Sequence, residues 1–177
     1  GLQIGDRLLI EKITFRRRPP RRGEIVVFNS PDSFDKQLIA NRSKPLPSSL
    51  HCAFVTFPWI SWIPGLGDSA CDAYIKRVVG VAGDRVSVNT KGEVSVNGQF
   101  IKEPFVSNYC QSDLNGFGCR PLKVLVPLSH VLVLGDNRRN SLDSRVWPGG
   151  PFLPEEEIIG KAAWRFWPMK RVGLLKP

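Results

Sequence analysis

Hydrophobic and polar residues alternate through much of the chain with the two-residue period of a β-strand. The clearest case is residues 84–99, DRVSVNTKGEVSVNGQ. On the two sides of NTKG, four valines share one parity: Val86, Val88, Val94 and Val96. This pattern predicts a β-hairpin with one apolar face. The Asn97–Gly98 pair that follows is typical of a further tight turn.

Continuous apolar runs that end in turn residues predict further strands. Residues 23–31 (GEIVVFNSP) and 130–137 (HVLVLGDN) indicate short strands, and residues 161–175 (KAAWRFWPMKRVGLL) indicate a strand interrupted by Pro168. Only residues 154–160 (PEEEIIG) predict a helical turn, since they begin with Pro, continue with acidic residues and end in Gly. With 16 Gly and 15 Pro in 177 residues, the sequence predicts one mainly β domain with very little helix.

Residues 29–72 interrupt the strand pattern and indicate a loop-rich insertion. They begin rich in Ser and Pro and continue as FVTFPWISWIPGLG (54–67), which contains Trp59 and Trp62. This segment is too short and too rich in Pro to span a bilayer. Two interpretations stay open, namely a loop packed on the sheet and an aromatic patch at a membrane interface.

The chain is basic, with a formal net charge of +9. Its densest cluster is RRRPPRR (16–22), where two prolines favour a stiff extended connector over a basic helix. Such a charge suits nucleic acid or an anionic membrane surface. Since no nucleic-acid-binding motif accompanies it, we expect no nucleic-acid partner and favour a solvated loop or a membrane-facing edge.

The four cysteines favour disulfide bonds. Cys52, Cys71, Cys110 and Cys119 lack C-x-x-C spacing, and the two histidines are not spaced like zinc ligands, so we expect no metal site. An even number of cysteines in loop-like surroundings favours an oxidising compartment. Cys110 and Cys119 flank a Gly-containing turn and could pair readily, which would leave Cys52 with Cys71. Three pairings remain open from the residues alone, as do reduced, packed cysteines.

Lys76 lies in a predicted strand, AYIKRVVGVAGD (73–84), where Tyr74 and Val78 share its face. A lysine that is enclosed by apolar groups loses hydration, and its pKa falls. A neutral amine can take a proton from a serine hydroxyl, as in Ser–Lys nucleophilic catalysis. On spacing alone, a solvated strand lysine is the better interpretation.

A strongly polar segment, GDNRRNSLDSR (135–145), follows the apolar strand VLVL directly. Its Asp and Arg residues can bind each other bidentately, and its Asn and Ser side chains can bond the backbone of the loop. Such a rigid loop could hold a hydroxyl against a lysine. An ordinary polar loop has the same composition, so the segment by itself is ambiguous.

Four stretches taken together resemble bacterial signal peptidase I, and their sequences are most similar in pattern to those of its cyanobacterial and plastid members. They are LQIGDRLLIEK (2–12), RRGEIVVF (21–28), YIKRVVGVAGD (74–84) and LGDNRRNSLDSRVW (134–147). The resemblance implies a single catalytic domain over residues 1–177, built on an antiparallel β-sheet or partly open barrel. Residues 29–72 and 102–128 match no family pattern and are expected to be variable insertions.

The resemblance also implies the activity and the site. A Ser–Lys endopeptidase of this family removes signal peptides from exported preproteins after small residues at positions −1 and −3, and we expect neither a metal nor a nucleotide cofactor. Lys76 falls on the family's general base, and Ser141 on the serine that orients it. The remaining loop residues are expected to support the site: Asp136, Asn137, Asp143 and Arg145.

The family's nucleophilic serine belongs to a Ser-Met-x-Pro stretch that would lie four residues before Gly1. We therefore expect this polypeptide to lack its nucleophile and its transmembrane anchor, and to be inactive alone. In the full-length protein, this domain is expected on the periplasmic or thylakoid-lumenal side of a membrane, beside the lipid surface.

The resemblance places the substrate as an added β-strand along the edges of Val26–Phe28 and Tyr74–Ile75. The residues expected to contact it are Tyr74, Ile75, Val27, Leu2 and Ile4, for which ordinary core packing is the alternative. Two other functions remain open: a self-cleaving, repressor-type Ser–Lys peptidase, and a basic β-domain that binds anionic lipid or nucleic acid.

Overall fold

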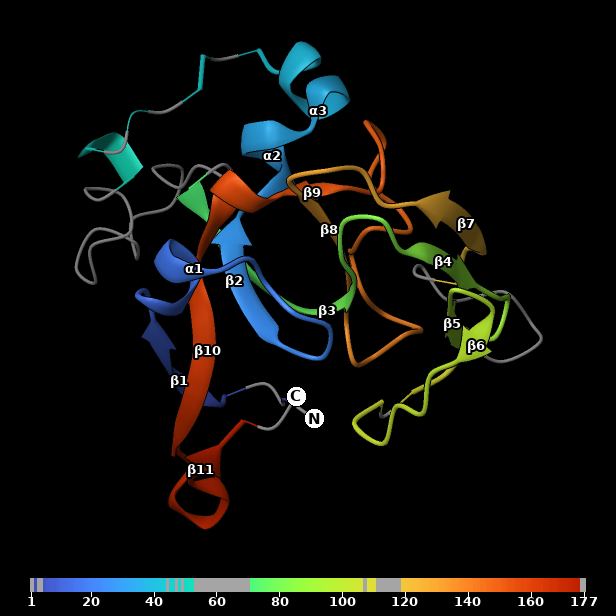
Figure 1. Ribbon diagram of the computed structural model, residues 1–177. Helices are drawn as coiled ribbons and strands as arrows, with labels where there is room; N and C mark the ends of the chain where they lie inside the picture. Colours follow the sequence, from blue (N-terminus) through green and yellow to red (C-terminus); the bar gives the residue numbers. More distant parts are fainter. Residues whose placement is uncertain are drawn as a thin grey trace.

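The computed structural model describes residues 2, 5–43, 45–46, 48, 50–52, 71–106, 108–110 and 119–175. Within these residues, two open antiparallel β-sheets lie side by side, with a few short helices around the larger one (Figure 1). The predicted mainly β class with little helix is therefore confirmed. The aromatic stretch 54–67 lies outside the described residues.

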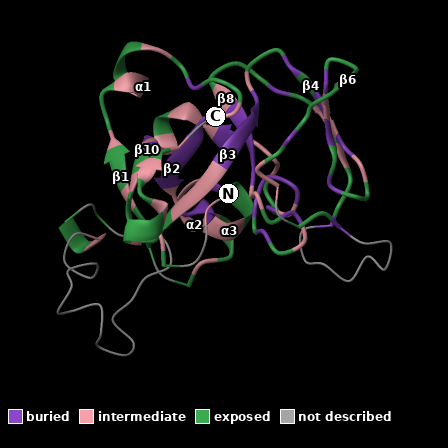
Figure 2. Cartoon of the chain, turned by 90° about the horizontal axis from the view of Figure 1, so that it is seen from below, coloured by how far each residue is buried: buried purple, intermediate pink, exposed green. Residues whose placement is uncertain are grey.

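The larger sheet carries the elements that form the candidate site. Its strands follow in the order β1 (Arg7–Glu11), β10 (Ile158–Trp167), β2 (Ile25–Asn29), β3 (Ala73–Gly80), β8 (His130–Leu134) and β9 (Leu153–Pro154), and β11 (Gly173–Leu174) pairs with β10. Strand β2 is buried on both faces (purple in Figure 2), because Val26 and Phe28 pack in one apolar cluster while Ile25 and Val27 pack in another. Such double burial explains its uninterrupted apolar run.

The smaller sheet confirms the predicted valine hairpin. Its order is β6 (Gln99–Phe100), β5 (Val94–Val96), β4 (Arg85–Val88) and β7 (Leu122–Leu125). Val86 pairs with Val96 and Val88 with Val94. All four are buried and pack against Leu132 and Leu134 of β8, so the apolar face of this sheet packs against one end of the larger sheet. The Asn97–Gly98 turn has positive φ angles of 52° and 85°, as a two-residue hairpin turn requires.

The helices are short: α1 (Thr14–Arg17), α2 (Pro31–Phe34), α3 (Lys36–Ala40), and the 3₁₀ turns Glu155–Glu157 and Met169–Arg171. Two predictions need correction here. The helical turn expected over residues 154–160 is limited to Glu155–Glu157, because Ile158 and Gly160 pair with β2 as part of β10. Arg16 and Arg17 end α1 and so are not part of an extended connector.

Of the three pairings left open by the sequence, the structure has Cys52–Cys71 and Cys110–Cys119. The described part of the 29–72 segment is anchored to the larger sheet by Phe34, whose ring lies 6.4 Å from Phe28 and 5.5 Å from Trp147 between centroids. These aromatic contacts bury one face of α2 on the sheet.

Glu24, just before β2, is a buried carboxylate that joins α1 to β10. Arg18 donates to its two oxygens at 2.6 and 3.0 Å, Lys161 Nζ at 2.8 Å, and the backbone N–H of Arg21 at 2.9 Å. Burial by itself raises the pKa of Glu24, but these donors together outweigh it and lower the pKa from 4.5 to about 2.

Glu24→Gln is expected to destabilise the fold in a pH-dependent way. Because the pKa is lower in the folded protein, the stabilisation is complete above about pH 4.5 and is lost as the pH falls toward 2. At pH 7 we expect a loss of about 1–2 kcal/mol in the free energy of unfolding, after allowing for solvent screening of Arg18 and Lys161. Thermal unfolding at pH 7 and pH 2.5 measures it, with exposed Glu156→Gln as the control. An equal deficit at both pH values would contradict this account.

Candidate active site

Strand pairing brings Lys76 of β3 beside the polar loop that follows β8. The two strands pair from Gly80↔Leu132 to Arg77↔Leu134, so the chain leaves β8 at Gly135 next to Lys76. A Cβ placed on Gly135 would lie 3.7 Å from Lys76 Cδ and only 2.1 Å from Ser141 Oγ. Lys76 and Ser141, 65 positions apart in the sequence, therefore flank the same glycine.

Lys76 is half-buried, and its environment favours the neutral amine. Burial is the main cause of a lowered Lys76 pKa, while the carboxylates of Asp143 and Asp136 act in the opposite direction. Its Nζ donates to the Ile75 carbonyl at 3.2 Å and stands 5.4 Å from the centre of the Tyr74 ring. A lowered pKa increases the fraction of neutral amine at a given pH, which suits a general base.

Ser141 presents a buried hydroxyl beside this amine. The residue is 6% exposed, and its Oγ makes no hydrogen bond to the described part of the chain. A buried hydroxyl without a partner is costly, which favours a role at the site. The structure brings Ser141 and Lys76 together, and the predicted orienting role of Ser141 remains a prediction.

Asp143 and Arg145 hold the loop through an ion pair in which both side chains are fully buried. Arg145 Nε and Nη2 donate to the two Asp143 carboxylate oxygens at 2.9 and 2.8 Å. The same Asp143 accepts from the backbone N–H of Gly135 at 3.0 Å. The bidentate pair expected from the sequence thus closes the loop from residue 135 to residue 145.

Asp136 ties the start of the loop to β3 through Arg77. Arg77 Nε and Nη2 donate to the Asp136 carboxylate at 3.0 Å each, and Nη1 donates to the Gly23 carbonyl at 2.7 Å. The guanidinium of Arg77 also stacks 3.7 Å from the Phe105 ring centre. Asn137 is exposed, and its side chain accepts from the Asn140 N–H at 3.3 Å.

Two arginines with a part in this site were missed by the sequence analysis, Arg77 and Arg138. For Arg77 the sequence offered a signal: it follows Lys76 on the same strand, and consecutive strand residues on opposite faces can both support one site. Nothing in the sequence distinguished Arg138 from the adjacent Arg139.

An apolar cleft of about 420 Å³ opens over Lys76. One part of its lining is apolar and consists of Leu2, Leu8, Ile25 and Ile75. The other part is polar and includes Lys76, Asp136 and Ser141. Small apolar side chains can enter such a cleft next to the amine. Among the described residues, no three His, Cys, Asp or Glu side chains are grouped so that they could hold a metal ion.

The residues predicted to contact a substrate fall into three groups. Leu2 and Ile75 line the cleft. Val27 is buried in the cluster around Ala162, and Tyr74 packs on Phe28 with ring centres 6.1 Å apart, so neither belongs to the cleft lining. Ile4 lies outside the described residues.

The expected docking edge also needs correction. Strand β2 pairs with β10 on one side and β3 on the other, so Val26–Phe28 offers no open edge. Strand β8 pairs with β3 only from Arg77 onward, so among the described strands residues 73–76 keep one unpaired edge. An extended peptide could add to that edge beside Lys76. The geometry suits chemistry on an extended polypeptide.

Comparison with known proteins identifies the family. The family model for signal peptidase, peptidase S26, matches residues 1–167, and the chain belongs to this family. It is 40% identical over 174 residues to probable signal peptidase I-2 of Synechocystis sp., which covers 98% of this chain and 61% of that protein. It is 38% identical over 176 residues to signal peptidase I of Leptolyngbya laminosa, which covers 99% of this chain and 67% of that protein.

A plastid relative is also similar. The chain is 32% identical over 172 residues to thylakoidal processing peptidase 1 of Arabidopsis thaliana, which covers 97% of this chain and 40% of that protein. A solved signal peptidase I from Enterococcus faecalis matches 81% of this chain and 97% of its own, with a TM-score of 0.49 and 19% identity. The predicted resemblance to this family, with its cyanobacterial and plastid members, is confirmed. The chain spans about two thirds or less of the lengths of these three relatives.

Proposed function

We propose that the full-length protein is a signal peptidase I that removes signal peptides from exported preproteins. In this proposal Lys76 is the general base for a serine that precedes Gly1. The observation that carries the proposal is the half-buried Lys76, whose pKa is lowered, in an apolar cleft beside an open strand edge. Membership of the signal peptidase family supports it.

The proposed reaction proceeds in two proton-balanced steps. Neutral Lys76 Nζ takes the proton of the serine hydroxyl as the serine oxygen attacks the substrate carbonyl, and the resulting ammonium gives that proton to the leaving amine. Water then attacks the acyl-enzyme, and Lys76 takes a proton from this water. The Lys76 ammonium returns the proton to the serine oxygen as the acyl group leaves as a carboxylic acid. Ser141 and Gly135 hold Lys76 in place, while the Asp143–Arg145 pair holds the loop.

The proposed substrate specificity is supported by the open strand edge and by membership of the signal peptidase family. A peptide added to residues 73–76 directs alternate side chains to the same side, so positions −1 and −3 would both face the cleft. Ile75 and Leu2 form apolar walls there. We therefore propose cleavage after small residues in the A-x-A pattern.

A synthetic preprotein tests this specificity with the full-length protein. Ala→Phe at position −1 or −3 is expected to lower kcat/KM by about two orders of magnitude, because signal-peptide cleavage sites carry small residues at these two positions. Ala→Phe at position −2 is the matched control, expected to change kcat/KM by less than about threefold since that side chain points away. Equal losses at −1, −2 and −3 would contradict the proposed binding mode.

The proposed location is the lumenal or periplasmic face of a membrane. Two disulfides suit an oxidising compartment. Leu9, Trp164 and Leu174 are neighbours across β1, β10 and β11, with exposed fractions of 60%, 39% and 69%. Exposed Trp residues in an apolar face favour the membrane interface. None of the helices within the described residues is long and apolar enough to cross a membrane.

Lipid contact through this face is testable with residues 1–177. Trp164→Asp is expected to weaken binding to vesicles that contain an anionic phospholipid by about tenfold, because it removes the apolar ring and adds a like charge. Leu125→Asp is the matched control, since Leu125 is 59% exposed on β7 of the smaller sheet. Vesicle flotation measures both. Equal weakening by the two variants would show that the Leu9–Trp164–Leu174 face has no special part in lipid binding.

A further inference from the structure

Arg138 and Glu103 form an ion pair that is removed from solvent. Their side chains are 1% and 2% exposed, and Arg138 is the largest fully buried side chain among the described residues. Two parallel hydrogen bonds join them: Nη2 donates to Glu103 Oε1 at 2.6 Å and Nη1 to Oε2 at 2.8 Å. Arg138 belongs to the loop that contains Ser141, whereas Glu103 lies between β6 and β7 of the smaller sheet. The pair therefore links two separate parts of the fold.

The same guanidinium makes two further contacts to backbone carbonyls. Nη1 also donates to the Gly92 carbonyl, in the turn between β4 and β5. Nε donates to the Gly135 carbonyl at 3.1 Å. One side chain thus connects the hairpin turn, the segment after β6 and the start of the loop that contains Ser141.

Gly135 is the residue on which these contacts converge. Its N–H donates to Asp143 at 3.0 Å, and its carbonyl accepts from Arg138 at 3.1 Å. Both sides of this glycine are therefore held by buried charged groups. Since a Cβ on Gly135 would meet both Ser141 and Lys76, this glycine lies next to both side chains, and its orientation affects how they face each other.

A second link joins the same two regions. The segment that begins at Glu103 continues to Asn108, whose carbonyl accepts from the Arg139 N–H at 3.3 Å and which bridges to Asn137. The Cys110–Cys119 disulfide follows directly, and Cys110 N–H donates to the Lys91 carbonyl at 3.0 Å. The smaller sheet and its following segment are thus attached along the outer side of the loop.

Stability alone does not explain a pair of this kind. A buried ion pair seldom stabilises a fold more than a well-packed apolar pair of similar volume, because both charges lose their hydration. Arg138 also has a planar fork that reaches several acceptors at once, which a point charge cannot do. These properties suit a pair that holds the loop in a fixed position better than a pair that only stabilises the fold.

We propose that the Arg138–Glu103 pair is the positioning element through which the smaller sheet holds Gly135, and with it Ser141, against Lys76. Arg138 is a positioning residue that acts through Gly135 and touches neither substrate nor the reacting atoms. The catalytic consequence rests on the proposed peptidase function, whereas the geometric consequence, an enclosed Lys76 amine, does not.

The informative change replaces both charges by apolar groups, Arg138→Met with Glu103→Leu. Removal of Arg138 alone would leave Glu103 buried and unpaired, so the single variant is expected to fold poorly. For the double variant we expect a melting temperature close to wild type. In the full-length protein we expect KM within about twofold and kcat lower by about a hundredfold, since a small misplacement of a catalytic group has effects of this size.

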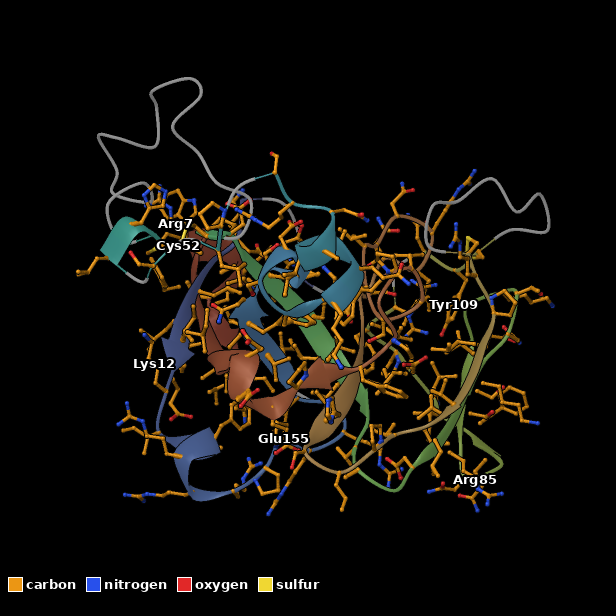
Figure 3. The ribbon with its side chains drawn as sticks, turned by 90° about the horizontal axis from the view of Figure 1, so that it is seen from above. Arg7, Lys12, Cys52, Arg85, Tyr109 and Glu155 are labelled. Atoms are coloured by element: carbon orange, nitrogen blue, oxygen red, sulfur yellow. A yellow bond between two sulfur atoms is a disulfide. The ribbon has the colours of Figure 1, made fainter. Side chains whose placement is uncertain are left out.

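Acetylation of Lys76, followed by mass spectrometry on residues 1–177, gives a readout that needs no activity. The double variant is expected to react about tenfold faster at Lys76 at about pH 11, where the amine is mostly neutral in both proteins, because a loosened loop admits the reagent. Arg85→Met is the matched control, an exposed arginine at the start of β4 in the smaller sheet that does not line the cleft (labelled in Figure 3). It is expected to leave both kcat and Lys76 acetylation unchanged.

Arg138→Lys provides an independent test if the double variant does not fold. It keeps a charge opposite Glu103 but loses the fork that reaches Gly135, so we expect about a tenfold loss of kcat and faster Lys76 acetylation. Wild-type kcat with wild-type Lys76 acetylation, in either folded variant, would overturn the proposed positioning role. If the full-length wild-type protein cleaves no preprotein, the peptidase proposal fails, while the acetylation rates still decide the positioning role.

Discussion

Lys76→Met in the full-length protein is expected to abolish signal-peptide cleavage while the fold survives. Methionine is close to lysine in length and tolerates the half-buried position, but it offers no nitrogen to accept a proton. Loss of a general base in this chemistry is expected to lower kcat by about four orders of magnitude. Lys76→Arg should be equally inactive, because a guanidinium remains protonated at all relevant pH values.

Lys123→Met is the matched control for this experiment. Lys123 also lies on a strand, β7, but its side chain is exposed and far along the smaller sheet from the cleft. We expect full activity from this variant, and unchanged circular dichroism and melting temperature from all three. Cleavage retained by Lys76→Met would refute the assignment of Lys76 as the base.

Gly135→Ala is expected to cause the second largest loss. The added methyl group would lie 2.1 Å from Ser141 Oγ and 2.7 Å from Ser141 Cβ, closer than real Cβ atoms approach their neighbours. Since Ser141 is buried next to Gly135, the shift that relieves the clash should move it away from Lys76. We expect kcat to fall by about two to three orders of magnitude, with a destabilisation of about 1–3 kcal/mol from overpacking.

Gly173→Ala separates the clash from a general effect of alanine. A Cβ on Gly173 would meet nothing within 4 Å, and this residue, like Gly135, lacks a positive φ. We expect activity and melting temperature close to wild type. If Gly135→Ala were as active as Gly173→Ala, close packing of Ser141 on Gly135 would not be needed for function.

The local sequence pattern was sufficient to predict elements whose residues alternate regularly between buried and exposed positions. The valine hairpin was predictable because one buried face imposes a two-residue period on Val86–Val96. The loop around Asp143 was predictable for a related reason, since its ion pair joins residues only two positions apart. In both cases the interacting groups lie close together in the sequence.

Long-range partners were not predictable in the same way. The docking edge was misplaced because β2 is covered on its second side by β10, more than a hundred residues later in the chain. The uninterrupted run IVVF was an available sign of a central strand buried on both faces. The Arg138–Glu103 pair left no such sign, since a single charge pair 35 residues apart has no periodicity and lies partly in the 102–128 segment.

The pH dependence of kcat/KM for the full-length protein tests most directly whether a neutral Lys76 amine is the base. Because burial lowers the Lys76 pKa from 10.5, activity should rise with pH through a single ionisation whose midpoint lies below pH 10.5. The folded variants that loosen the loop should shift this rise to higher pH, toward the ordinary lysine value. A rise centred near pH 10.5 in the wild-type protein, or a rate independent of pH between about 5 and 10, would contradict the account.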